Sequence, residues 1–285
     1  KDSVDIPRQY QILSGNSVQD GPALPLLRSL MPEEVLGASF RVYIGVKGDK
    51  IIKKYQHRIP RKSEGYFLKI EKDCIVIAGA DERGAYYGVQ TLAQLLALDK
   101  LPLAEVTDYP DVPYRGVVEG FYGAPWSQEA CIRQLDFYGR NKMNVYIYGP
   151  KDDPYHRTPN WRKPYPAREG EELKVLVNRA KENNVIFYWA IHPGQDIRWN
   201  EEDRSLLLQK FESMYQLGVR GFAVFFDDIS GEGTKADKQA ELLNYIDDHF
   251  VKVKRDVAPL ILCPTEYNKS WTDVEGGYLT TLGDK

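Results

Sequence analysis

The sequence predicts an α/β protein in which a small mixed α/β domain precedes a larger domain built on a parallel sheet. Five strand-like apolar runs follow Pro113 and alternate with amphipathic segments. These runs are apolar almost throughout, which is typical of parallel strands that helices cover on both faces. Before Pro113, two strand-like runs abut as they would in a hairpin, and one helical segment follows them.

The composition excludes several classes of protein. With 285 residues, 42% hydrophobic and 28% charged, the chain can bury a core and is not a disordered protein. The 38 Lys and Arg against 41 Asp and Glu give a net charge of −3, and no basic block interrupts the pattern. We therefore expect no nucleic-acid partner. We also expect no membrane insertion, because no apolar run approaches the ~18 residues of a spanning helix, and the first residues lack the apolar core of a signal peptide.

The cysteines and the glycines point to no bound group. Cys74, Cys131 and Cys263 are far apart and form no metal-ligand spacing, and no phosphate-binding glycine fingerprint follows any strand. We expect neither a metal nor a cofactor. The aromatic content is 12%, with 19 Tyr and 5 Trp, which suits amphipathic ligands such as sugars but also fits ordinary core residues.

The predicted first domain covers residues 1–112. A helix is expected after its strands, because Ala85, Val89, Leu92 and Leu96 share one helical face. The proline-containing segment from 101 to 116 is expected to be a linker. The predicted strands are Phe40–Gly48, Gly65–Asp73 and Cys74–Asp81.

The predicted second domain covers residues 113–285. Its helices are expected at 127–140, 169–183, 201–217 and 235–254, with Ser127 as the N-cap of the first and Glu129 in its first turn. The pattern alone fits an open doubly wound sheet or a (β/α)₈ barrel, although the missing glycine fingerprint counts against a nucleotide-binding open sheet. The predicted strands are Val117–Phe121, Asn144–Gly149, Val185–Ile191, Gly221–Phe226 and Pro259–Cys263.

Polar residues follow each of these strands, and in barrel enzymes the chemistry lies at that edge. The strongest candidate is the pair Asp227 and Asp228, which comes directly after Phe225 and Phe226. Strand alternation would separate the two side chains unless the strand ends or bulges there. The structural alternative for the pair is capping of the next helix. The other residues expected at the rim are Glu119 to Gly123, Lys151 to Asp153, His192 to Gly194 and Thr265 to Asn268.

Two adjacent carboxylates would divide acid and base roles. When they share one pocket, one pKa rises and its neighbour stays ionised. Glycoside hydrolysis uses such a pair, but adjacent aspartates are too close to flank a sugar as acid and nucleophile. Attack by a group of the substrate itself would resolve this conflict.

Three motifs resemble glycoside hydrolase family 84, the β-N-acetylglucosaminidase family that includes O-GlcNAcases. They are YRGVVEGFYGAPWS (114–127), YGPKDDPYHR (148–157) and AVFFDDI (223–229). The segment 77–96 is similar to the small domain that precedes such barrels in hexosaminidases. The resemblance implies a (β/α)₈ TIM barrel, of which about five strands lie in this chain, after a small mixed α/β domain.

The resemblance also implies a retaining, substrate-assisted hydrolysis of terminal β-linked GlcNAc through an oxazoline. Asp227 would orient the 2-acetamido group of a GlcNAc-containing glycan or glycoprotein, and Asp228 would be the general acid and base. The implied substrate-binding residues are Gly120, through its carbonyl, Lys151, on sugar hydroxyls, Tyr267, on the acetamido group, and Cys263, in the acetamido pocket.

Other interpretations remain open. A related hexosaminidase or chitinase is one, although Ile229 and Ser230 after the pair do not fit their motifs, and a non-catalytic carbohydrate-binding barrel is another. The part after Pro113 is shorter than the ~250 residues of a complete barrel, so we expect the remaining strands to be missing. The resemblance favours a periplasmic or secreted location over a cytoplasmic one, and nothing in the sequence specifies the oligomeric state.

Overall fold

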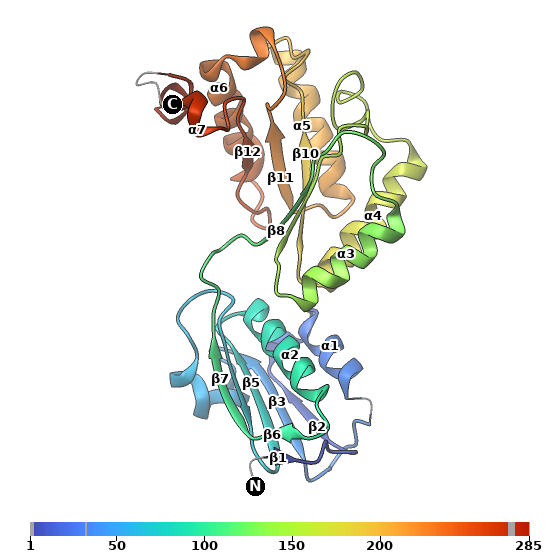
Figure 1. The fold of residues 1–285 in the computed structure, drawn as a ribbon, viewed down its shortest axis with the longest axis vertical. Helices are drawn as coiled ribbons and strands as arrows, with labels where there is room; N and C mark the ends of the chain where they lie inside the picture. Colours follow the sequence, from blue (N-terminus) through green and yellow to red (C-terminus); the bar gives the residue numbers. More distant parts are fainter. Residues whose placement is uncertain (1–2, 32, 273–276, 285) are drawn as a thin grey trace. The chain divides into compact units, whose positions relative to one another are not determined.

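The fold is an α/β arrangement of two compact units, described from a computed structural model covering residues 3–31, 33–272 and 277–284 (Figure 1). One unit comprises Lys1–Arg115, Tyr138–Met143 and Glu182–Asn184. The other comprises Gly116–Phe137, Asn144–Lys181 and Val185–Lys285. None of the helices among the described residues combines the length and the apolar character that a membrane crossing requires.

The first unit contains a five-stranded mixed sheet in the order β2-β3-β5-β4-β7. Helices α1 and α2 pack on one face, and the 3₁₀ segment η2 packs on the other (Figure 1). The strands are β1 (Ser3–Val4), β2 (Gln11–Ser14), β3 (Arg41–Val46), β4 (Tyr66–Ile70), β5 (Cys74–Gly79), β6 (Leu101–Pro102) and β7 (Ala104–Asp108). The helical segments are η1 (Asn16–Val18), α1 (Ala23–Leu30), η2 (Lys50–Arg58) and α2 (Glu82–Leu96).

The predicted hairpin and helix of this unit are confirmed. Strands β4 and β5 pair antiparallel, and α2 begins where Asp81 accepts a hydrogen bond from the Gly84 main-chain nitrogen at 2.8 Å. The predicted linker is wrong, because residues 104–108 form β7, which pairs antiparallel with β4 at the sheet edge. Pro102 and Pro110 obscured this strand in the sequence, but prolines are tolerated at sheet edges.

The second unit is a curled parallel half-barrel whose strands follow chain order, β8-β9-β10-β11-β12 (Figure 1). The predicted β/α alternation is therefore confirmed. The strands are β8 (Gly116–Glu119), β9 (Val145–Tyr148), β10 (Ile186–Ile191), β11 (Gly221–Phe225) and β12 (Ile261–Cys263). The helical segments are α3 (Gln128–Arg140), α4 (Ala167–Glu182), α5 (Glu201–Gln216), η3 (Gly231–Thr234), α6 (Ala236–Ile246), the π-helical η4 (Asp247–Val251), α7 (Lys269–Thr272) and α8 (Tyr278–Gly283).

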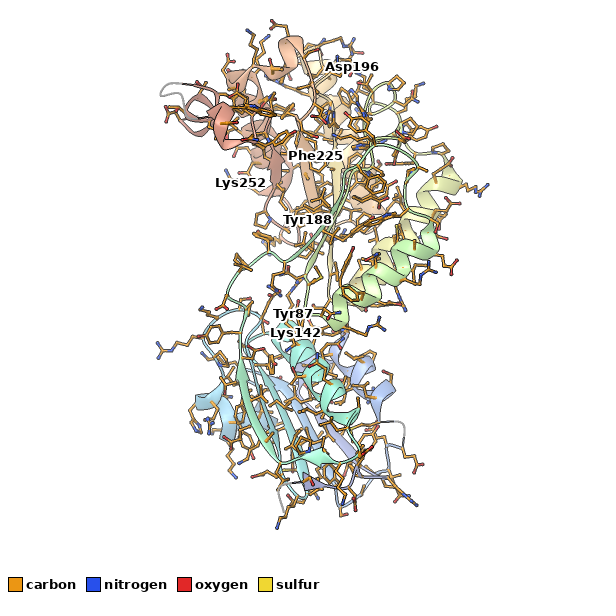
Figure 2. The ribbon with its side chains drawn as sticks, in the orientation of Figure 1. Tyr87, Lys142, Tyr188, Asp196, Phe225 and Lys252 are labelled. Carbon is orange, nitrogen blue, oxygen red and sulfur yellow. The ribbon has the colours of Figure 1, made fainter. Side chains whose placement is uncertain are left out.

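Both faces of the half-barrel sheet carry apolar side chains, as the unbroken apolar runs predict. Tyr188 and Phe225 belong to the cluster on one face (Figure 2). Trp189 and Phe222 point to the other face, where both rings pack near Phe211 of α5. The predicted N-cap of α3 is also confirmed, because the Ala130 main-chain nitrogen donates to Ser127 Oγ at 3.2 Å.

A buried lysine gives this unit a testable pH dependence. Lys210 is 3% exposed, donates to the Lys163 carbonyl and lies 4.4 Å from the Tyr165 ring centre. Burial lowers its pKa from the ordinary value of 10.5 to about 8, against the smaller opposing effect of Asp153. Between these two pH values the unfolded chain binds more protons than the folded one, so this group makes stability rise with pH.

Lys210→Met is expected to abolish that rise. The unfolding free energy of the wild type should gain on the order of 3 kcal/mol, relative to the methionine variant, between pH 7 and pH 10.5. Urea unfolding of both proteins at several pH values measures the difference. A constant difference across this range would contradict the prediction.

Candidate active site

The two candidate aspartates lie directly beyond β11. In the register of β11 with β12, Ala223 and Phe225 face the same side of the sheet as Ile261 and Cys263. Continued alternation along β11 places Asp227 on that side. Asp228 has a φ of 52°, in the left-handed region. This conformation costs a non-glycine residue about 1–2 kcal/mol, and such strain is common at functional sites. The strand has therefore ended at the pair, which is the condition under which both carboxylates can serve one pocket.

Asp227 is held from two neighbouring strands. Its Oδ2 accepts a hydrogen bond from Lys151 Nζ at 2.6 Å, and His192 Nε2 lies 3.5 Å from its Oδ1. Burial raises the pKa of this carboxyl, but the nearby His192 ring, the hydrogen bond from Lys151 and the charge of Lys151 outweigh that effect. The net pKa lies below its usual range, so Asp227 is ionised at neutral pH. Its Oδ1 is buried and has no hydrogen-bond partner within the described part of the chain.

Asp228 has different neighbours. The Tyr122 hydroxyl donates a hydrogen bond to Asp228 Oδ2 at 3.3 Å. The negative charge of Asp228, followed by burial and the charge of Asp227, raises the pKa of Tyr267. No ion pair involves Asp228 among the residues that the structure describes. One carboxylate is therefore fixed by a lysine, while the other faces phenol groups.

The remaining predicted residues lie around this pair. Cys263 is opposite Phe225 in the register, and burial, with the charge of Asp227, raises its pKa to about 12. Tyr267 follows β12 and is 54% exposed. Gly120 follows β8, and the flanking Phe121 carbonyl accepts a hydrogen bond from the Lys151 main chain at 3.0 Å. The structure thus brings Lys151, Cys263 and Tyr267 to the aspartates, and places Gly120 one strand away from Lys151.

Glu119 is not at the rim, contrary to expectation. It pairs in register with Tyr148, on the helix-covered face, and is fully buried. Its carboxylate accepts hydrogen bonds from the Tyr146 hydroxyl and from the Trp126 main-chain nitrogen, the latter at 2.8 Å. Glu119 therefore braces the loop after β8.

The loop that carries the aspartates is held on both sides. Thr265 Oγ1 donates to the Phe226 carbonyl at 2.8 Å, and Phe226 N donates to the Cys263 carbonyl at 2.9 Å. On the other side, a Cβ on Gly233 would lie 1.8 Å from the Gly194 carbonyl oxygen. Only glycine fits this close approach between the loops after β10 and β11.

Two side chains at this site were recognised in the sequence only as rim residues, with no role. They are Tyr122, which bonds Asp228, and His192, which bonds Asp227. Their positions after β8 and β10 were the available signal. Their partners depend on how the strand ends meet, which the sequence pattern does not specify.

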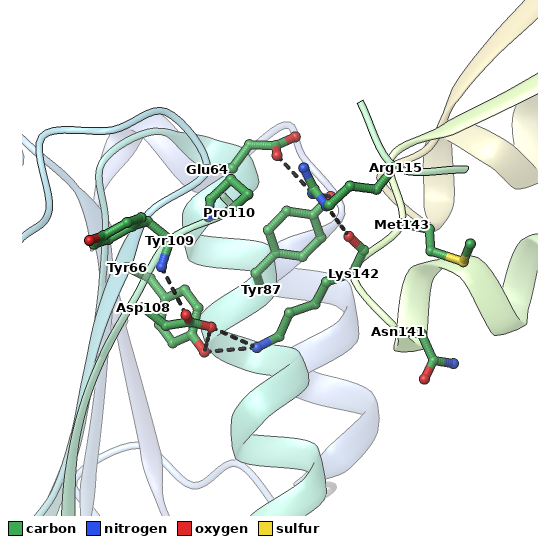
Figure 3. A pocket seen from close by; sticks show the side chains of 10 residues that line it. All are labelled: Glu64, Tyr66, Tyr87, Asp108, Tyr109, Pro110, Arg115, Asn141, Lys142 and Met143. Carbon is green, nitrogen blue, oxygen red and sulfur yellow. Dashed lines mark hydrogen bonds and ion pairs between the residues drawn. The ribbon is translucent and has the colours of Figure 1, made fainter. Parts of the chain in front are cut away.

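Other candidate sites lie elsewhere. A cavity of about 280 Å³ in the first unit is lined by tyrosines and by charged groups that pair with each other, including Lys142 with Asp108 at 3.4 Å and Arg115 with Glu64 at 2.8 Å (Figure 3). A second cavity, of about 350 Å³, lies beside α3 and α4. Among the described residues, the group with metal-ligand geometry is Glu71, Asp73 and Cys74, at the β4–β5 turn, where Glu71 already pairs with Lys69.

Comparison with known proteins identifies relatives of both parts of the chain. Residues 115–285 match the family model described as beta-N-acetylglucosaminidase, and residues 37–109 match glycosyl hydrolase family 20, domain 2. The protein O-GlcNAcase of Rattus norvegicus is 36% identical over 179 residues, which are 60% of this chain and 19% of that protein.

Solved structures extend the similarity over the whole chain. The structure of CpGH84B has a TM-score of 0.91 and 36% identity, covering 100% of this chain and 52% of that one. The structure of CpGH84D has a TM-score of 0.89 and 28% identity, covering 99% and 51%. The chain thus spans about half the length of these solved relatives. It belongs to the beta-N-acetylglucosaminidase family, glycoside hydrolase family 84.

Proposed function

We propose that the protein is a retaining β-N-acetylglucosaminidase that removes terminal β-linked GlcNAc by substrate assistance, within a (β/α)₈ barrel that this chain supplies in part. The observation that carries the proposal is the unlike setting of two adjacent carboxylates. Asp227 is kept ionised by Lys151 and His192, whereas Asp228 faces the hydroxyl of Tyr122. Such a pair supplies one fixed negative charge and one group that can exchange a proton.

In the first step, the carbonyl oxygen of the substrate's 2-acetamido group bonds to the anomeric carbon. Asp227 accepts a hydrogen bond from the acetamido N–H, and its Oδ1, which has no hydrogen-bond partner among the described residues, is the available acceptor. Asp228 gives its proton to the glycosidic oxygen as the bond from that oxygen to the anomeric carbon breaks. The products of this step are the free alcohol and an oxazoline.

In the second step, Asp228 takes a proton from water, and the water oxygen bonds to the anomeric carbon. The bond from the oxazoline oxygen to the anomeric carbon breaks, which restores the acetamido group. Two inversions at that carbon give overall retention.

The family resemblance implies the substrate-binding roles, and the positions of these residues near the aspartates support them. Lys151 has three N–H donors and uses one on Asp227, so another can reach a sugar hydroxyl. Tyr267 would bond the acetamido group, Cys263 would line the pocket for its methyl group, and the Gly120 carbonyl would accept from a hydroxyl.

The test compares aryl β-GlcNAc with aryl β-glucoside, which lacks the acetamido group. We expect turnover of the first alone, a rate that falls as fluorine replaces hydrogen on the acetyl group, and strong inhibition by a thiazoline analogue of the oxazoline. Rates that do not change across the fluorine series would overturn the substrate-assisted mechanism. Binding of GlcNAc without turnover would instead favour a non-catalytic carbohydrate-binding barrel.

A further inference from the structure

The His192 ring contacts both the main-chain carbonyl and the side chain of Asp227. It is the first residue after β10 and is 1% exposed. Its main-chain nitrogen donates to the His156 carbonyl at 2.7 Å, which fixes the point from which the ring extends. Ring atom Nε2 then lies 2.7 Å from the Asp227 carbonyl oxygen, closer than the 3.5 Å to Oδ1.

The bond to the carbonyl identifies the proton on the ring. A carbonyl oxygen can only accept, so Nε2 must carry the hydrogen. The other ring nitrogen, Nδ1, is buried and has no hydrogen-bond partner among the described residues. The ring therefore makes its polar contacts with Asp227 through Nε2.

This carbonyl controls the direction of the next residue. It belongs to the peptide plane that joins Asp227 to Asp228, and rotation of that plane changes φ of Asp228. Asp228 has a φ of 52°, a conformation that persists in a non-glycine residue where the surroundings hold it. The Nε2–H bond acts on the atom whose movement would release this turn.

We propose that His192 is a positioning residue that holds the Asp227–Asp228 peptide plane and thereby turns Asp228 toward the same pocket as Asp227. The proposal rests on the proposed function, in which both carboxylates act on one sugar. Loss of the bond would leave Asp228 out of line with the leaving oxygen, and misplacement of a reacting group by about 1 Å slows reactions by about a hundredfold.

Two amide variants separate the bond from general packing. The amide nitrogen of Gln is as many bonds from Cα as Nε2 of His, whereas that of Asn corresponds to Nδ1. His192→Gln should therefore keep the donor, and His192→Asn should lose it. The matched control is His156→Asn, because the buried His156 bonds the Ala190 carbonyl through Nδ1 at 3.1 Å and Asn retains that donor.

Activity is measured on the full chain with GlcNAc conjugates of good and poor leaving groups, and crystal structures give φ of Asp228. We expect His192→Asn to lose kcat by about 10- to 100-fold on poor leaving groups and less on good ones, with Asp228 out of the left-handed region. The kcat of His192→Gln should stay within about threefold of the wild type, because this variant keeps the hydrogen bond. The kcat of His156→Asn should stay within the same range.

Equal rates and an unchanged φ in His192→Asn would overturn the proposal, as would equal losses in the Asn and Gln variants. Should His192→Asn not fold, nitrogen NMR of the wild type decides, because a proton on Nδ1 in place of Nε2 would contradict the bond. A wild type that hydrolyses no GlcNAc conjugate would refute the proposed function, while φ of Asp228 and the tautomer would still test the role of His192.

Discussion

Asp228→Ala is expected to slow hydrolysis of GlcNAc conjugates with poor leaving groups by about 10²- to 10⁴-fold, the usual contribution of a positioned general acid. Conjugates whose leaving groups depart without a proton should lose much less in the first step. The reason is the position of Asp228, which bonds the Tyr122 hydroxyl and pairs with no cation among the described residues. Steady-state kcat/KM across a series of aryl leaving groups measures the effect, as a steeper dependence on the leaving-group pKa.

Asp248→Ala is the matched control for this prediction. Asp248 also belongs to an Asp-Asp pair, but it lies in η4, is exposed and pairs with Lys252 at 2.7 Å. We expect wild-type kinetics from it. An Asp228→Ala variant that slows good and poor leaving groups by the same factor would refute the general-acid role.

Asp227→Asn is expected to lower kcat by about 10²- to 10³-fold for all leaving groups alike, the range seen when one preorganised stabilising group is removed. The change keeps the shape of the side chain and removes the charge that would stabilise the acetamido group as it attacks. It also leaves the buried ammonium of Lys151 without its anion, which is 2.6 Å away in the wild type. Single-turnover rates on activated and unactivated substrates measure the loss.

The variant Lys151→Met, alone and combined with Asp227→Asn, separates the two effects. If the loss of kcat in Asp227→Asn came only from leaving the Lys151 charge buried and unpaired, the double variant would recover stability and activity relative to Asp227→Asn. We expect recovery of thermal stability without recovery of kcat. Full recovery of kcat would show that Asp227 serves only to balance Lys151.

The sequence was most informative where local pattern and local structure agree. The apolar run Gly221–Phe226 predicts a strand buried on both faces. Strand β11 has that character because Phe222 packs near Phe211 of α5 on one face, and Phe225 belongs to the apolar cluster on the other. Ser127 was identified as an N-cap from position alone, since capping involves only the next three residues. The edge strand β7 was missed, because its pairing with β4 is decided across more than thirty residues.

The residues of the site show the same division. Asp227 and Asp228 were found because they directly follow an apolar strand. Lys151 and Tyr267 were expected at the rim from their positions after strands, and their roles, like that of Cys263, came from the family resemblance. Glu119 was misplaced, because its hydrogen-bond donors come from Trp126, in the loop before α3, and from Tyr146 of β9.

Local sequence was thus sufficient to predict the β/α alternation, the elements of the half-barrel and the identity of the acidic pair, because each depends on periodicity or on adjacent residues. The unequal roles proposed for two identical side chains depend on tertiary structure. Lys151 arrives from the end of β9 and His192 from the end of β10, and the left-handed turn at Asp228 ends the alternation that would have separated the pair. Charge, burial and peptide orientation at that edge arise only when parallel strands distant in sequence lie side by side.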